Sequence, residues 1–131
     1  MILPRAPLLS PKLVRRSGQI GKLPTYAHWC PGCNEMHDFA VEHSFHDGSR
    51  WSYDGNPVAP TFAPSMNIRR GPFPTGSSRA GQMEVCHYFL HGGRIQFLGD
   101  CTHVLRGQTV PLPDIPASAA ERCWLAEQVP A

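Results

Sequence analysis

The sequence has 131 residues, of which 17% are charged, and a formal net charge of +2. A chain of this length forms one domain with a modest core, and so small a charge argues against a nucleic-acid-binding surface. Its 14 prolines and 12 glycines predict many turns, short strands and little long helix. We therefore expect a small, mainly β domain.

No apolar stretch reaches the roughly 20 residues that a membrane-spanning helix needs, so no membrane is expected among the partners. Prolines at positions 4, 7 and 11 interrupt the apolar residues near the N-terminus, which argues against a signal peptide. We expect a soluble protein. Five cysteines, an odd number, indicate metal binding or free thiols in a reducing compartment rather than a set of disulfides.

Residues 1–22 show neither helical nor strand periodicity, which predicts an extended N-terminal arm. When such an arm is ordered, it packs on a partner or wraps its own domain. It is therefore a candidate for oligomer or virion assembly. The remainder, residues 23–131, is expected to be a single β-rich domain that binds zinc, for the reasons that follow.

The domain begins with a knuckle, Cys30-Pro31-Gly32-Cys33, followed by His37. Two cysteines separated by Pro-Gly form a tight turn that suits a thiolate-bound metal. Redox pairs with this spacing usually open a helix, whereas a strand is predicted here, so zinc is favoured over a redox pair. The knuckle supplies only two thiolates, so other segments must complete a four-coordinate site.

The segments after the knuckle read mostly as strands. Partial alternation predicts strands over residues 38–45 and 51–53. Two prolines argue against helix and central-strand pairing over residues 59–68, which predicts a constrained loop leading into a strand. Residues 107–113 read as a last extended segment. Residues 118–128 are predicted to form a short C-terminal helix with the first residue as its N-cap.

The clearest secondary structure is a β-hairpin over residues 85–98, with two strand-like runs joined by the loop His91-Gly92-Gly93. Counting back from a three-residue loop places His87 and Phe89 on the core face and Cys86 on the opposite face. The hairpin thus contributes one candidate ligand and one candidate catalytic base.

Cys86 ranks next to Cys30 and Cys33 as a metal ligand, because a strand holds it rigidly. The fourth position is open between His37 and Cys101, and His103 is a further candidate.

A second constellation comprises Ser65, His87 and Asp100. Ser65 follows a proline in a stiff segment, and Asp100 lies just beyond the second strand of the hairpin. The three side chains could act as nucleophile, base and orienting carboxylate.

Several motifs together resemble a small domain family common in tailed-phage and prophage genomes: Cys30-Pro31-Gly32-Cys33, Ala59-Pro60-Thr61-Phe62-Ala63-Pro64-Ser65, Cys86-His87 and Asp100-Cys101-Thr102-His103. Some members are labelled ammonia monooxygenases, which these residues do not support. Related domains occur in bacterial ubiquitin-like modification operons and are regarded as peptidases. The resemblance covers roughly residues 26–113.

The resemblance implies metal binding at Cys30, Cys33 and Cys86, and makes Ser65 and His87 the leading catalytic candidates. The relatives space the later Cys and His further apart than the adjacent pair found here. Since neighbouring strand residues face opposite ways, one side chain would face a metal and the other would face Ser65.

Two hypotheses follow. The first is a phage-type zinc-binding hydrolase, a peptidase acting on a protein or peptide, in which zinc is structural and the Ser/His site performs acyl transfer. The second is a non-enzymatic, zinc-stabilised module that binds a protein or forms part of a virion. Either version would be found in the cytoplasm of a bacterial host or in the virion.

Overall fold

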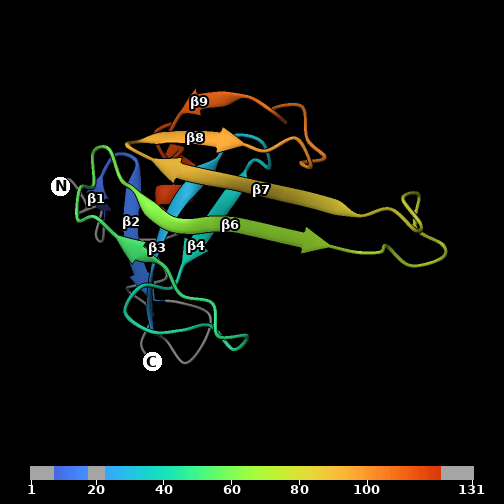
Figure 1. The fold of residues 1–131 in the computed structure, drawn as a ribbon, viewed down its shortest axis with the longest axis horizontal. Helices are drawn as coiled ribbons and strands as arrows, with labels where there is room; N and C mark the ends of the chain where they lie inside the picture. The colour runs from blue at the N-terminus through green and yellow to red at the C-terminus, as the bar shows by residue number, and fades with distance from the viewer. Residues whose placement is uncertain (1–7, 18–22, 122–131) are drawn as a thin grey trace.

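The structure is a computed structural model that describes residues 8–17 and 23–121. It is mainly β, as the composition predicts, and the described residues form two antiparallel sheets (Figure 1). The first sheet contains β1 (Leu8–Ser10), β2 (Leu13–Ser17), β3 (Pro24–Cys30) and β4 (Glu35–Phe39), in that order. The second contains, also in order, β5 (Ser52–Tyr53), β6 (Phe62–Arg70), β7 (Glu84–His91), β8 (Arg94–Phe97) and β9 (Thr109–Pro111).

The main core lies between the two sheets, because both contribute to one cluster of buried side chains. Phe39 of the first sheet stacks on Phe62 of the second, with ring centroids 4.3 Å apart. Tyr88 of β7 and Leu13 of β2 are fully buried in the same cluster. Beyond this core, the β6–β7 hairpin projects with its connecting loop at the tip (Figure 1). Packing of the two sheets on this shared core brings side chains of β3 into contact with side chains of β7.

The N-terminal region differs from the predicted arm, because residues 8–17 form β1 and β2 of the first sheet. Val14 pairs with Ala27 of β3, and both side chains are fully buried. The expectation that this region lacks strand structure is therefore wrong for residues 8–17. Alternation is weak there because adjacent Leu13 and Val14 are both buried, one in each of two core clusters.

Residues 59–68 were expected to avoid central-strand pairing, and this prediction is wrong. β6 lies between β5 and β7, with Pro64 inside it. The register against β7 shifts between Phe62 and Met66, so this part of β6 does not follow the regular ladder with β7. A bulge of this kind tolerates a residue without an N–H.

The hairpin is confirmed, but its register differs by one residue from the prediction. Leu90 pairs with Ile95, and Tyr88 pairs with Phe97. The turn consists of Gly92 and Gly93 alone, both with positive φ, as two-residue hairpin turns require. A one-residue slip turns every side chain to the other face.

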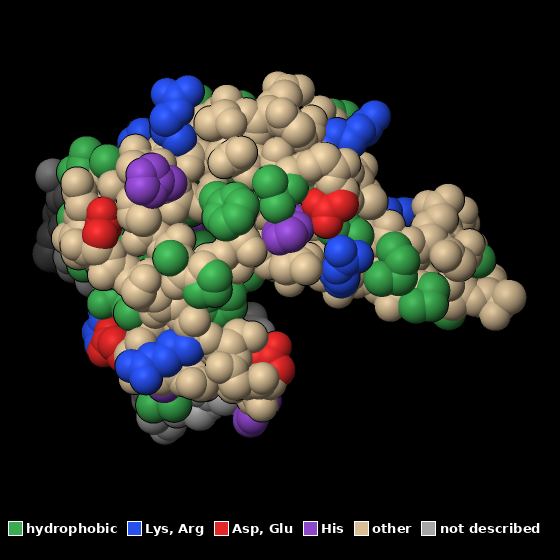
Figure 2. All heavy atoms as spheres, viewed as in Figure 1, with side chains coloured by type: hydrophobic (Ala, Val, Ile, Leu, Met, Phe, Trp, Pro, Cys, Tyr) green, Lys and Arg blue, Asp and Glu red, His purple; other side chains and the backbone are tan. Residues whose placement is uncertain are grey.

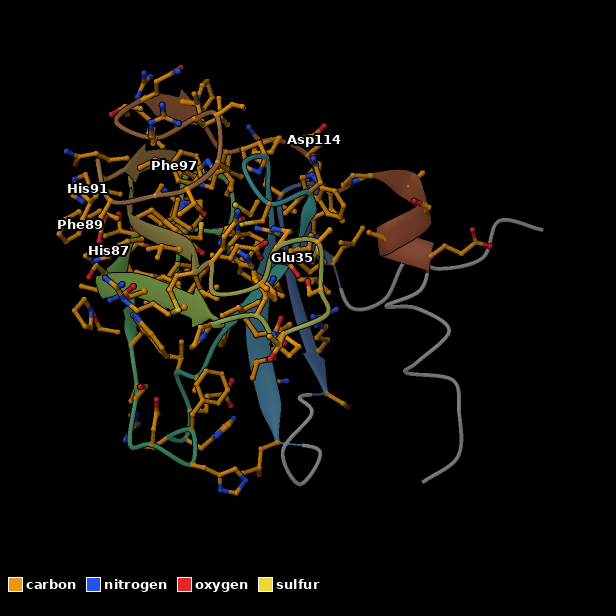
Figure 3. The ribbon with its side chains drawn as sticks, turned by 90° about the vertical axis from the view of Figure 1, so that its right-hand side faces the viewer. Glu35, His87, Phe89, His91, Phe97 and Asp114 are labelled. Atoms are coloured by element: carbon orange, nitrogen blue, oxygen red, sulfur yellow. The ribbon has the colours of Figure 1, made fainter. Side chains whose placement is uncertain are left out.

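The core face of β7 therefore carries Cys86, Tyr88 and Leu90, all at most 2% exposed. His87 and Phe89 were predicted on the core face, which is wrong. Phe89 is 43% exposed, and Figure 3 shows His87, Phe89 and His91 along one side of the molecule.

Two further boundaries differ from the sequence-based ones. The strand predicted over residues 38–45 is instead β4, which ends at Phe39; the backbone N–H of Trp51 then bonds to the carbonyl of Ala40 at 2.8 Å. The helix begins at residue 117 rather than after Ser118, because the carbonyl of Pro116 accepts the N–H of Ala120. The rest of the predicted helix, from residue 122, lies outside the described residues.

Among the described residues, no helix has the length and apolar character needed to cross a membrane.

Candidate functional site

Ser65, His87 and Asp100 come together on the outer face of the second sheet. The Oγ of Ser65 lies 3.2 Å from Nε2 of His87. On the other side of the ring, Nδ1 of His87 lies 3.1 Å from a carboxylate oxygen of Asp100. Since an ionised carboxylate can only accept, Nδ1 carries the proton and Nε2 is free to accept the hydroxyl proton of Ser65. The order of groups is that of a nucleophile, a base and an orienting carboxylate.

Ser65 is placed by the irregular part of β6. It directly follows Pro64, within the stretch where the register against β7 shifts. The indole Nε1 of Trp51, a largely buried core residue, donates a hydrogen bond of 3.2 Å to the carbonyl of Ser65. Trp51 thus packs in the core and holds the Ser65 backbone.

His87 and Asp100 are placed by Cys101, which is 3% exposed. The Cys101 thiol donates to the carbonyl of His87 at 3.1 Å, and its sulfur accepts the backbone N–H of His87 at 3.2 Å. This pair of contacts fixes the segment after β8 against β7. The Asp100 carboxylate is thereby held within hydrogen-bonding distance of His87 Nδ1.

The hydrogen bond from His87 lowers the pKa of Asp100 below its usual range, and Arg69 adds to the effect. Arg69 Nη2 lies 3.4 Å from the same carboxylate. Asp100 is therefore a carboxylate at neutral pH, as an orienting group must be. In Figure 2 a His side chain lies against an acidic side chain over β7, open to solvent.

Ser65 lines a groove beside the loop that follows β4. The groove encloses about 400 Å³, and its walls include the apolar side chains of Trp51, Met66 and Ile68. Asp38, Asp47 and Arg50 add charges of both signs to the lining, and Asp38 is paired with Arg16. Figure 2 shows the surface hollowed below β6 in this region. A chain lying in this groove would pass Ser65, whereas His87 and Asp100 are not among the residues that line it.

The opposite face of β7 carries a cluster of sulfur and nitrogen ligands. Cys30, Cys33, His37 and Cys86 each offer one ligand atom, and these atoms all lie within 4.8 Å of one another. Cys30 ends β3, and His37 lies in β4, so the knuckle is the turn between these strands. These four residues could hold a metal ion.

The chemistry of the cluster fits a soft divalent cation. Three thiols and an imidazole form a donor set typical of tetrahedral zinc. Hydrogen bonds from Cys33 and Cys86 lower the pKa of Cys30 to about 4 despite its burial. His37 is 3% exposed, and its Nε2 is one of two buried side-chain N or O atoms among the described residues that lack a hydrogen-bond partner. A buried polar atom without a partner costs free energy, which a bound metal would recover.

A second group, Cys86, Cys101 and His103, shares one thiol with the first. His103 Nε2 lies 3.5 Å from the Cys86 sulfur, and His103 Nδ1 accepts the N–H of Leu105 at 3.2 Å. Because Nδ1 accepts, Nε2 carries the proton and donates to Cys86. In this arrangement His103 hydrogen-bonds a candidate ligand and offers no lone pair to a metal.

The packing of His103 requires a glycine at position 32 of the knuckle. A Cβ at this position would lie 2.4 Å from the His103 ring. Only glycine leaves room for the His103 imidazole against the turn. In this position His103 lies beside Cys86.

Arg69 and Arg70, at the end of β6, are both engaged in ion pairs. Arg69 contacts Asp100, while Arg70 contacts Glu35 at 2.6 Å and Glu84 at 3.2 Å. Both guanidinium groups are therefore paired with carboxylates of this chain.

The sequence did not single out Tyr88 and His28, which lie behind the cysteine cluster. Both are fully buried, and the Tyr88 hydroxyl lies 2.6 Å from His28 Nε2. Burial lowers the pKa of His28 to about 3, and the nearby His37 adds to this. The only signal in the sequence is that each is a polar residue on the inward face of its strand. That face can be recognised only when the register of the strand is known.

The family model for the bacterial ubiquitination-like system serine protease (BubE) matches residues 4–98. The chain belongs to the BubE family. The match includes Ser65, His87 and the four residues of the first ligand group, whereas Asp100, Cys101 and His103 lie just beyond it. Comparisons with curated proteins and with solved structures give no match. The BubE description agrees with the resemblance to domains of ubiquitin-like operons, while the phage association stays a prediction.

Proposed function

We propose that the chain is a serine peptidase in which Ser65, His87 and Asp100 perform acyl transfer. The observation that carries this proposal is the continuous hydrogen-bonded order from Ser65 through His87 to Asp100. Membership of a family described as serine proteases supports it independently. A half-buried His bonded on one side to a hydroxyl and on the other to a carboxylate is the arrangement that activates a serine.

In this mechanism the Ser65 oxygen attacks the carbonyl carbon of the scissile bond while His87 Nε2 takes the hydroxyl proton. His87 then gives that proton to the leaving amine, which departs and leaves an acyl group on Ser65. Water, deprotonated by His87, releases the acyl group as a carboxylic acid and restores the serine. Throughout, Asp100 accepts from Nδ1 and stabilises the imidazolium.

The substrate in this proposal is a protein or peptide with an extended tail, such as that of a ubiquitin-like protein. The groove beside Ser65 supports it, since its apolar and charged lining suits an extended chain better than a small polar molecule. The family description, which refers to a ubiquitination-like system, points the same way.

We propose that Cys30, Cys33, His37 and Cys86 hold a structural zinc ion. Four ligands complete its coordination, and they lie on the face of β7 opposite Ser65. A zinc ion in this position would tie the β3–β4 turn to the strand that carries His87. The residues at the reaction centre would then need no metal.

The experiment is cleavage of a ubiquitin-like tail peptide by the wild type and by Ser65→Ala. Loss of about a thousandfold or more is expected, with an unchanged thermal midpoint. Ser52→Ala is the matched control. The Ser52 hydroxyl donates a hydrogen bond of 3.3 Å to the carbonyl of Ala63 in β6 and is not part of the Ser65–His87–Asp100 order. Equal activity of Ser65→Ala and wild type would remove Ser65 from the mechanism.

The alternative, a non-enzymatic binding module, would be favoured by a Ser65–His87 separation well beyond a bridging water. The observed 3.2 Å supports the hydrolase instead. A phage or virion role, and a cytoplasmic location in a bacterial host, remain expectations that cell fractionation would test.

A further inference from the structure

The candidate metal ligand His37 has different surroundings at its two ring nitrogens. Its Nδ1 lies 3.1 Å from the Tyr88 hydroxyl, and its Nε2 has no hydrogen-bond partner. A neutral imidazole carries one proton, and only the nitrogen without it can bind a metal. Which nitrogen carries the proton therefore decides whether His37 can complete the site.

A chain of three hydrogen bonds determines the answer. His28 Nδ1 lies 3.1 Å from the carbonyl of Trp29, which can only accept, so this nitrogen carries the His28 proton. The ring is neutral and buried, so its Nε2 must accept. Its partner at 2.6 Å is the Tyr88 hydroxyl, which therefore donates to His28.

With its proton given to His28, the Tyr88 oxygen can only accept from the other side. His37 Nδ1 is the group at that side, so Nδ1 carries the proton and donates to Tyr88. The lone pair of His37 is thereby left on Nε2, the buried atom without a partner. Each donor in this chain is therefore assigned from the acceptor before it, and the first acceptor is the backbone carbonyl of Trp29.

We propose that Tyr88 and His28 are positioning residues that fix the His37 tautomer and present Nε2 to a thiolate-bound divalent metal ion. The inference rests on the metal part of the proposed function and is independent of the peptidase part. The outer partners of metal-bound histidines commonly set ring orientation and ligand basicity in this way. Here the partner is a buried tyrosine, itself oriented by a second histidine.

Two neighbours could compete for His37 or for its role, and neither does so here. Glu35 Oε1 is 3.8 Å from Nε2, beyond hydrogen-bonding distance, and it is held at 2.6 Å by Arg70. His103 has the opposite tautomer, with its proton on Nε2 and directed at Cys86. The two imidazoles at the cluster therefore differ in function: His37 offers a lone pair and His103 a proton.

The test replaces Tyr88 with Phe, which removes the hydroxyl and keeps the ring. Tyr53→Phe is the matched control, since Tyr53 packs on Phe62 and Tyr26 outside this chain of bonds. Affinity for Zn²⁺ is measured by competition with a chromophoric chelator. Tyr88→Phe should weaken it about 10- to 100-fold, and Tyr53→Phe should leave it unchanged. An affinity of Tyr88→Phe within twofold of wild type would overturn the proposal.

A second measurement needs no variant and stands even if Tyr88→Phe does not fold. Two-bond ¹⁵N–¹H correlation spectra of the isolated wild-type protein report the proton position on each imidazole. The proposal expects His37 protonated on Nδ1, with or without zinc, and His28 protonated on Nδ1. A proton on His37 Nε2, or zinc bound through Nδ1, would overturn it. Wild type that binds no zinc yet shows these tautomers would refute the structural-zinc proposal but leave the hydrogen-bonded chain intact.

Discussion

A histidine with a hydrogen-bond partner at its Nδ1 lies at each of the two faces of β7, and we assign the two histidines different functions. On the outer face, Asp100 accepts from one nitrogen of His87 and leaves the other to Ser65. On the inner face, the Tyr88 hydroxyl bonds to Nδ1 of His37 and leaves Nε2 without a hydrogen-bond partner, and His37 lies with three cysteines in the first ligand group. In both cases a hydrogen-bond acceptor at Nδ1 fixes the proton on that nitrogen and leaves the lone pair on Nε2.

The difference lies in solvent access. The His87 side chain is 22% exposed and Asp100 is 43% exposed, whereas the His37 side chain is 1% exposed. In the proposed function His87 must meet a substrate and so has to be accessible, whereas the proposed zinc ligand His37 can be buried if it is paired with a metal. Because Cys86 and His87 are adjacent, a single strand imposes both environments.

The sharpest test of this contrast replaces these two neighbours separately. Cys86→Ser should lose both bound zinc and cooperative folding, since metal binding at such sites is coupled to folding. His87→Ala should keep zinc and the thermal midpoint but lose about a thousandfold or more in peptide cleavage. Metal content by atomic emission, thermal unfolding by circular dichroism and a cleavage assay provide the three readouts.

Cys101→Ser is the control for the inner face. Cys101 belongs to the second group and bonds to the His87 backbone rather than to the four-ligand set, so its replacement should retain zinc. A Cys86→Ser protein that folds normally without zinc would contradict the structural role of the cluster. Zinc loss in Cys101→Ser would move the fourth ligand from His37 to Cys101.

A second test addresses the orientation of β7 directly. Leu90 is 2% exposed and Phe89 is 43% exposed. Leu90→Ala should lower the free energy of unfolding by about 2–5 kcal/mol through lost burial and a cavity. Phe89→Ala should change it by only about 0.5 kcal/mol. Urea unfolding measures both, and a larger loss for Phe89→Ala would restore the register that a three-residue loop predicts.

Residue chemistry and spacing predicted much of both sites. The knuckle indicated thiolate ligands, and Cys86, Ser65, His87 and Asp100 were all candidates before their positions were known. These predictions depend on residue type, which is visible in the sequence. The mainly β class and the hairpin followed from turn residues and strand composition in the same way.

What the sequence could not supply was the direction of each side chain. Either Gly92-Gly93 or His91-Gly92-Gly93 is an acceptable hairpin loop, and the choice moves His87 from one face to the other. Tyr88 and His28 gain a role only after the sheets bring β3, β4 and β7 together. Similarly, residues 8–17 lack a regular strand pattern because both sides of β2 are covered.

The smallest expected effect concerns pH and the outer face. The hydrogen bond from His87 lowers the pKa of Asp100 in the folded protein relative to its ordinary value of about 3.9. A lowered carboxyl pKa stabilises the folded state above the ordinary value, and this contribution is lost as the pH falls through the lower, folded-state value. Asp100→Asn should therefore have a slightly lower urea midpoint than wild type at pH 7, and the difference should disappear once the pH is low enough to protonate Asp100 in the folded protein. The effect is small because Asp100 is exposed to solvent. Equal urea midpoints for Asp100→Asn and wild type at pH 7 would mean that the contact with His87 does not stabilise the fold in solution.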